Sequence, residues 1–193
     1  MALPQRLLIR VPRGAKCPEV ASFFAQLEDL SRRMYEDLAG AKPAELAWQP
    51  RRGMNTIGML LVHCAIVDAF WLSLATGVRT ADDADRQLAA AIGVAGDFDG
   101  MPIAAGAKPP RALAGWTLAR FRRLHDRARR FAKRRAARLA PADLDLVLRL
   151  RRPNGALRLV NPRWILYHVL EHQAGHYGQM LLLRHQYRDR RDS

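Results

Sequence analysis

The chain is poor in cysteine, with two in 193 residues and no CxxC pair. This scarcity excludes a disulfide framework and a thiolate zinc site, and it is typical of a reducing compartment. Long hydrophobic runs are also lacking, because the longest, Ile57 to Leu74, is interrupted by His63 and Asp68. We therefore expect no membrane span. The first residues lack the apolar segment of a signal peptide, so the sequence predicts a cytoplasmic protein with no membrane partner.

Lysine is scarce as well, with four among the 32 basic residues, although the net charge is +14. The charge comes from arginine, which is densest between residues 120 and 138. Such a segment can attract nucleic acid or another polyanion. It can equally be the solvated face of a helix in a protein whose codons favour arginine. We favour the solvated face, because no exposed aromatic pattern or nucleic-acid motif accompanies the arginines.

Hydrophobic spacing predicts four long helices, since apolar residues recur every three or four positions. The predicted helices span about residues 18–38, 55–77, 111–139 and 162–187, with a shorter helix at 85–92. Asn-Gly between two apolar runs predicts a β-hairpin over residues 146–160. The length suits one domain, residues 1–193. The sequence thus predicts an all-α four-helix bundle with a small β-hairpin before the last helix.

Three histidines lie four residues apart in the last predicted helix, namely His168, His172 and His176. Four residues bring a side chain back to within about 40° of its starting direction, so all three lie on one stripe. Two imidazoles so spaced can bind one ion, as in the HExxH helix. His168 and His176 are about 12 Å apart along the axis. The pair is therefore His168 with His172 or His172 with His176, and spacing does not choose between them.

His63 is the candidate third ligand, because an unsatisfied imidazole in the most apolar helix would be costly. The alternative is that these histidines are core or interhelical hydrogen-bonding residues. Cys64 and Asp68 point about 100° and 140° away from His63. We expect Cys64 to be a small buried residue, and Asp68 to pair with an arginine or another polar group of the bundle. His125 and His185 are expected at the surface.

Two sequence blocks carry a resemblance to a known family. The segments Glu45 to Pro50 and Asn55 to His63 resemble the entry to the second helix of the DinB-like (YfiT-like) superfamily. The segment Tyr167 to Gln179 is similar to its fourth-helix signature, a histidine pair followed by Gly-Gln. The resemblance covers most of residues 18–187 but not 80–110. It implies an up-down-down-up bundle, often a homodimer, with three histidines on one metal ion.

By this resemblance the metal ligands are His63, His172 and His176, which chooses the second of the two helical pairs. Members often carry arginine where this chain has Tyr177, which removes any basis for carrying over a role at that position. The implied cofactor is a divalent ion, zinc or nickel first and iron as an alternative. Three neutral imidazoles leave an open coordination position, as in catalytic metal sites.

Related enzymes transfer low-molecular-weight thiols such as bacillithiol or mycothiol, or use the thiol to isomerise a substrate. The resemblance thus implies a metal-dependent thiol S-transferase or isomerase with a small-molecule substrate and a thiol partner. His168 and Tyr177 are the candidate catalytic residues, as proton-transfer groups near the ligands. A hydrolase that uses bound hydroxide is one alternative. A basic nucleic-acid-binding module with a non-catalytic metal site is another.

Overall fold

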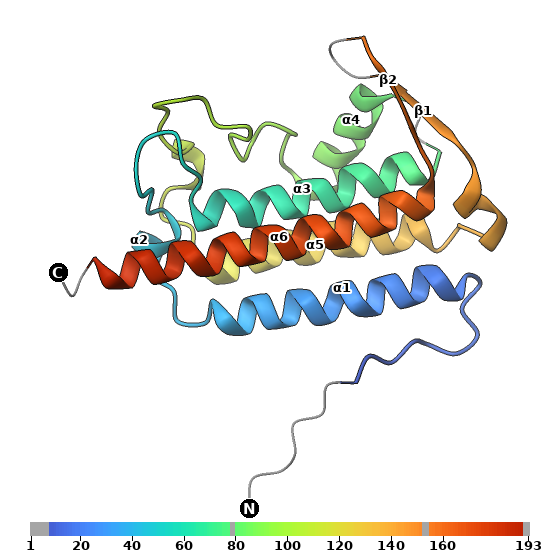
Figure 1. Cartoon of the computed structure of the whole chain (residues 1–193), viewed down its shortest axis with the longest axis horizontal. Coiled ribbons are helices and arrows are strands. Elements are labelled where there is room, and N and C mark those ends of the chain that lie inside the picture. The colour runs from blue at the N-terminus through green and yellow to red at the C-terminus, as the bar shows by residue number, and fades with distance from the viewer. Residues whose placement is uncertain (1–7, 78–79, 152–154, 191–193) are drawn as a thin grey trace, which may run out of the picture.

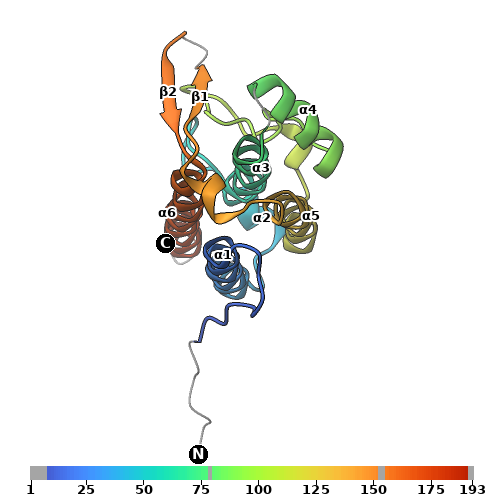
Figure 2. The same cartoon turned by 90° about the vertical axis from the view of Figure 1, so that its right-hand side faces the viewer.

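The computed structural model describes residues 8–77, 80–151 and 155–190. It is mostly helical, and one antiparallel two-stranded hairpin precedes the last helix, as the sequence predicted. Four long helices lie side by side (Figures 1 and 2). They are α1 (Pro18–Asp37), α3 (Ile57–Ala75), α5 (Leu118–Ala136) and α6 (Pro162–Asp189). The short elements are α2 (Pro43–Leu46), α4 (Ala81–Ile92), 3-10 turns at Arg111–Leu113 and Pro141–Asp145, β1 (Leu148–Arg151) and β2 (Leu157–Val160).

Side-chain caps fix the starts of three of the four long helices, α3, α5 and α6. Thr56 accepts a hydrogen bond from the backbone N–H of Met59 at the start of α3, and Asn161 accepts one from that of Trp164 at the start of α6. The third long helix begins at Leu118 and not at residue 111. The expected start was too early because Gly115 adopts a left-handed backbone, with φ +72°, which a helix does not tolerate.

Helix α3 is the centre of the molecule. Sixteen of its 19 residues are buried, and it contacts α4, α5 and α6. By length and composition alone α3 could cross a membrane, but 83% of its most apolar 18-residue stretch is buried inside the structure. Such burial among other helices is typical of the core helix of a soluble protein.

The hairpin pairs Leu148 with Val160 and Arg151 with Leu157. The predicted Pro-Asn-Gly turn lies partly outside the described residues, which omit 152–154. Val160, at the end of β2, is buried and leads through Asn161 directly into α6. The hairpin therefore sets the point at which the histidine-bearing helix begins.

A buried polar network joins all four long helices. The Arg129 guanidinium on α5 donates two hydrogen bonds to one carboxylate oxygen of Asp68 on α3, at 2.7 and 3.1 Å. It also donates to Ser31 on α1 and to Gln173 on α6. We call these residues, with His125, the Arg129 network. The predicted pairing of Asp68 with an arginine is confirmed.

His125 was wrongly expected at the surface, since it is buried and only 3% exposed. Its Nε2 lies 3.5 Å from an Asp68 carboxylate oxygen and 3.4 Å from the Arg129 guanidinium. Arg122, Arg123, Arg127 and Arg130 are exposed around it, but His125 and Arg129 lie on the inward stripe of α5. His185 is exposed, as expected.

Two glycines on long helices should respond oppositely to alanine. At Gly58 an added Cβ would lie 2.8 Å from the Phe121 ring and 3.2 Å from the Leu46 carbonyl oxygen. We expect Gly58→Ala to lower the free energy of unfolding by about 1–3 kcal/mol, the usual cost of overpacking a core. At Gly178 nothing lies within 4 Å of an added Cβ. Gly178→Ala should raise the free energy of unfolding by about 0.5–1 kcal/mol, because alanine loses less conformational entropy than glycine when the helix forms. Urea denaturation measures both, and equal signs would contradict this packing.

Candidate metal centre

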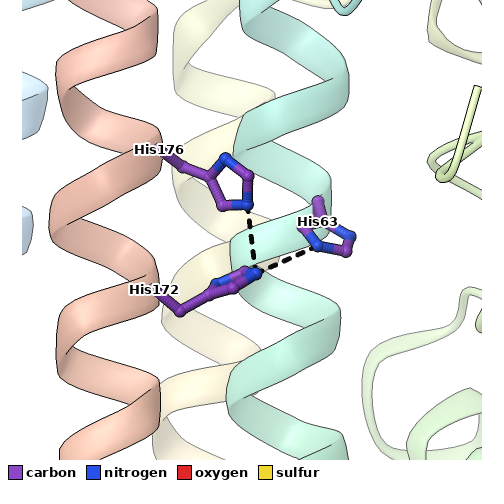
Figure 3. A group of neighbouring side chains, drawn as sticks. All are labelled: His63, His172 and His176. Atoms are coloured by element: carbon purple, nitrogen blue, oxygen red, sulfur yellow. Dashed lines mark hydrogen bonds between the residues drawn. The ribbon is translucent and has the colours of Figure 1, made fainter.

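Three histidines from two neighbouring helices point toward one another (Figure 3). His63 comes from α3, and His172 and His176 come from successive turns of α6. The Nε2 atom of His172 lies 3.1 Å from that of His63 and 3.0 Å from that of His176. One nitrogen from each of the three rings lies within 4.8 Å of the others. The structure thus brings together the three residues that the sequence and the resemblance singled out.

The opposite nitrogen of two of these rings is held by an oxygen acceptor. His63 Nδ1 lies 2.7 Å from a carboxylate oxygen of Asp99, and His176 Nδ1 lies 2.9 Å from the amide oxygen of Gln179. An oxygen acceptor fixes the proton of a neutral imidazole on Nδ1. The Nε2 atoms of His63 and His176 then carry no proton, and their lone pairs point toward His172.

These lone pairs fit a cation better than they fit a hydrogen-bonded cluster. One N–H on His172 Nε2 could be donated to only one of the two facing lone pairs, and the second contact would stay repulsive. His172 Nδ1 is buried and has no hydrogen-bond partner among the described residues, so this ring is not held by a polar network. Around a tetrahedral zinc ion with bonds of about 2.0–2.1 Å, neighbouring nitrogens are roughly 3.3 Å apart. Both Nε2 distances from His172 are close to this value.

Burial favours the neutral, metal-binding form of the two helical ligands. Burial, and then the neighbouring histidines, lower the pKa of His172 to about 3. Burial also lowers the pKa of His176, more than the hydrogen bond to Gln179 raises it. Both rings are therefore neutral at pH 7, and neutral imidazole is the form that binds a metal ion.

His168 lies beside this group but not within it. Its ring stacks on Trp164, with centroids 4.7 Å apart and planes 9° apart, and packs edge-on against Trp71. Its centroid is 5.7 Å from that of His172. Burial lowers its pKa, so it is a neutral base at pH 7. The geometry therefore groups His172 with His176, and His168 stays a candidate for proton transfer.

Tyr177, the second candidate catalytic residue, is engaged with another helix. Its hydroxyl donates to the Asp37 carboxylate at the end of α1. Burial, followed by this hydrogen bond, raises the pKa of Tyr177 to about 12. The hydroxyl is therefore protonated at neutral pH, which does not favour a role as a general base. Its catalytic role stays a prediction.

Cys64 is buried beside His63, as expected for a small core residue. Burial raises the pKa of its thiol well above the usual range, so it stays protonated and is a poor metal ligand. Sequence reasoning missed Asp99 and did not give Gln179 a role. Gln179 follows the histidine pair in the quoted motif, whereas Asp99 lies in a loop without periodicity, where no pattern could have identified it.

The arginine-rich face of α5 is largely solvent-exposed, as the preferred interpretation predicted. Several of its basic residues already have partners, since Arg120 lies over the Trp116 ring, Lys133 pairs with Glu28 and Arg135 donates to Thr76. Arg129, in contrast, points inward. Binding of nucleic acid to this face remains an alternative prediction.

Comparison with known families supplies an independent observation. The model of the DinB superfamily matches residues 26–180, which include all three histidines of the candidate centre. No match to a curated protein was found.

Proposed function

Because this chain belongs to the DinB superfamily, we propose that it is a metal-dependent thiol S-transferase whose divalent ion is held by His63, His172 and His176. The observation that carries the proposal is that the Nε2 atoms of three histidines face one another. In His63 and His176 an oxygen acceptor holds the proton on Nδ1, which leaves a lone pair on Nε2. Three imidazoles suit zinc or nickel, and also iron.

A divalent ion bound by three imidazoles would keep an open position at which a thiol is ionised. The chain's own residues would prepare the rest of the site. His63, His172 and His176 supply imidazole donors, and the partly buried rings of Trp71 and Trp164 hold His168 beside them. His168 would accept the thiol proton, because its lowered pKa keeps it neutral at pH 7.

The test combines metal content with turnover. Protein purified without an affinity tag should contain about one divalent ion per chain by elemental analysis, or bind one after dialysis against zinc or nickel. The loaded protein should consume a low-molecular-weight thiol together with an electrophile, and chelator-stripped protein should not. If the metal-loaded protein consumes an ester without any thiol, the thiol S-transferase proposal is wrong and the protein is a hydrolase. Absence of bound metal under both conditions would overturn the metal site itself.

We further propose that the chain is one domain in which the four long helices form the up-down-down-up bundle implied by the resemblance. Contacts between the starts of α3 and α5, and between their ends, support a parallel arrangement of these two helices. Phe121 approaches Gly58 near the starts of α5 and α3, and Arg135 bonds to Thr76 near their ends. In Figure 1 the colour runs in one direction along α1 and α6, and in the other along α3 and α5. A homodimer is part of the same proposal, and size-exclusion chromatography with light scattering tests it.

A further inference from the structure

Asp99 lies in the long connection between α4 and α5, outside every motif on which the resemblance rests. It is 0% exposed. One oxygen of its carboxylate accepts the backbone N–H of Met101 at 2.9 Å, and the other faces His63 Nδ1 at 2.7 Å. The side chain thus links a loop to a ligand of the candidate centre.

The loop holds this carboxylate in a defined direction. The backbone turns at Gly100, which has a left-handed φ of +69° and donates its N–H to the Asp97 carbonyl oxygen. A Cβ at Gly100 would lie 2.7 Å from the Pro110 side chain, so the turn is tightly packed. On either side, Phe98 and Met101 pack against the hydrophobic core. The orientation of Asp99 therefore does not depend on His63.

Stability alone gives little reason for a carboxylate at this position. A buried carboxylate loses its hydration, and an apolar side chain of similar volume is usually as stable or more so. Asp99 recovers only two hydrogen bonds from the described residues, and one of them is to His63. A carboxylate bound to the outer nitrogen of a metal-binding imidazole fixes the tautomer, orients the ring and raises its basicity.

We propose that Asp99 is a positioning residue for the metal, and that it keeps His63 as the Nδ1–H tautomer with its Nε2 lone pair toward the ion. This inference rests on the proposed metal-binding function. It assigns a role to the connection between α4 and α5, which delivers the buried carboxylate to a histidine on α3. In this chain the loop carboxylate does for His63 what the Gln179 amide does for His176.

The experiment compares Asp99→Ala and Asp99→Asn with Asp97→Ala, a control at an exposed aspartate of the same turn. Zinc affinity is measured by competition with a chromophoric chelator. Asp99→Ala should weaken zinc binding by about 10–100-fold, the usual effect of losing such a partner. Asp99→Asn should weaken it less, because its amide oxygen can still accept a hydrogen bond. Asp97→Ala should bind zinc as the wild type does.

The second readout is the tautomer of His63 in metal-free protein, obtained from long-range ¹H–¹⁵N correlation spectra. The wild type should show the proton on Nδ1, and Asp99→Ala should shift it partly to Nε2, which a purely structural role would not do. If Asp99→Ala does not fold by circular dichroism, Asp99→Asn supplies both readouts. Unchanged affinity and tautomer in variants of a zinc-binding wild type would overturn the role of Asp99 alone. A wild type that binds no zinc would instead overturn the proposed function, and this inference with it.

Discussion

Replacement of His172 by alanine is expected to weaken binding of the divalent ion by about 100–1,000-fold. The apparent binding free energy of a four-ligand structural zinc site is about 10–16 kcal/mol, so one ligand accounts for about 2.5–4 kcal/mol. His172 is the central member of the candidate centre, because its Nε2 is within 3.1 Å of the Nε2 atoms of both His63 and His176. Calorimetric titration with zinc, or metal content after dialysis, measures the loss.

His168→Ala is the matched control, since it removes an imidazole one turn earlier on the same helix. We expect this variant to keep its metal and to lose turnover, because His168 lies beside the three ligands without joining them. Loss of metal in His168→Ala with retention in His176→Ala would show that the helical pair is His168 with His172. Full affinity in His172→Ala would place the ion elsewhere.

Arg129→Met is expected to lower the free energy of unfolding by about 3–5 kcal/mol, because it leaves Asp68 as a buried, unpaired charge. Asp68 is 1% exposed and Arg129 is 8% exposed, so water replaces the lost partner poorly. Chemical denaturation measures the change. Arg130→Met, the neighbouring exposed position, should stay within about 0.5 kcal/mol of the wild type. Equal effects of the two substitutions would contradict the importance of the Arg129 network.

The pH dependence provides a second check on the same variant. In the wild type, burial raises the pKa of the Asp68 carboxyl, but Arg129 and His125 outweigh it and hold the pKa below its ordinary value. The ionised Asp68 carboxylate thus stabilises the folded state fully above the unfolded-state aspartate pKa of about 3.9. This stabilisation is lost only as pH falls through the lower pKa of Asp68 in the folded state. Without Arg129, burial dominates and raises the folded pKa, so the variant gains stability as protonation begins. The difference between the two proteins should narrow from pH 7 to pH 5.

Most of the fold could be predicted because hydrophobic spacing is a local property of the chain. The spacing located all four long helices, and the predicted starts at about residues 55 and 162 lie within two residues of the observed starts at Ile57 and Pro162. The third helix was placed seven residues too early because its composition gave no sign that Gly115 breaks the backbone. Local patterns therefore predicted the existence of each helix more reliably than the residue at which it begins or ends.

The candidate site could be predicted only in part, because its parts are brought together by tertiary packing. The spacing of His168, His172 and His176 is the same at each step. The choice between the two pairs therefore depends on which turns of α6 lie opposite His63 on α3. Arg129 could not be distinguished from the outward arginines, since its inward direction follows from its pairing with Asp68. No sequence pattern could bring Asp99 to His63 across 36 positions.

The two hydrophobic cores and the Arg129 network are built without any of the three histidines of the candidate centre. We therefore expect this scaffold to fold without a metal ion, unlike a zinc finger. The His63 side chain is 20% exposed, so ions can reach the centre in the folded state. An ion bound there would then be exchangeable. Its identity would depend on the supply of each metal and on its affinity for imidazole. The same polypeptide could therefore be loaded in turn with different metals, and the resulting proteins could be compared.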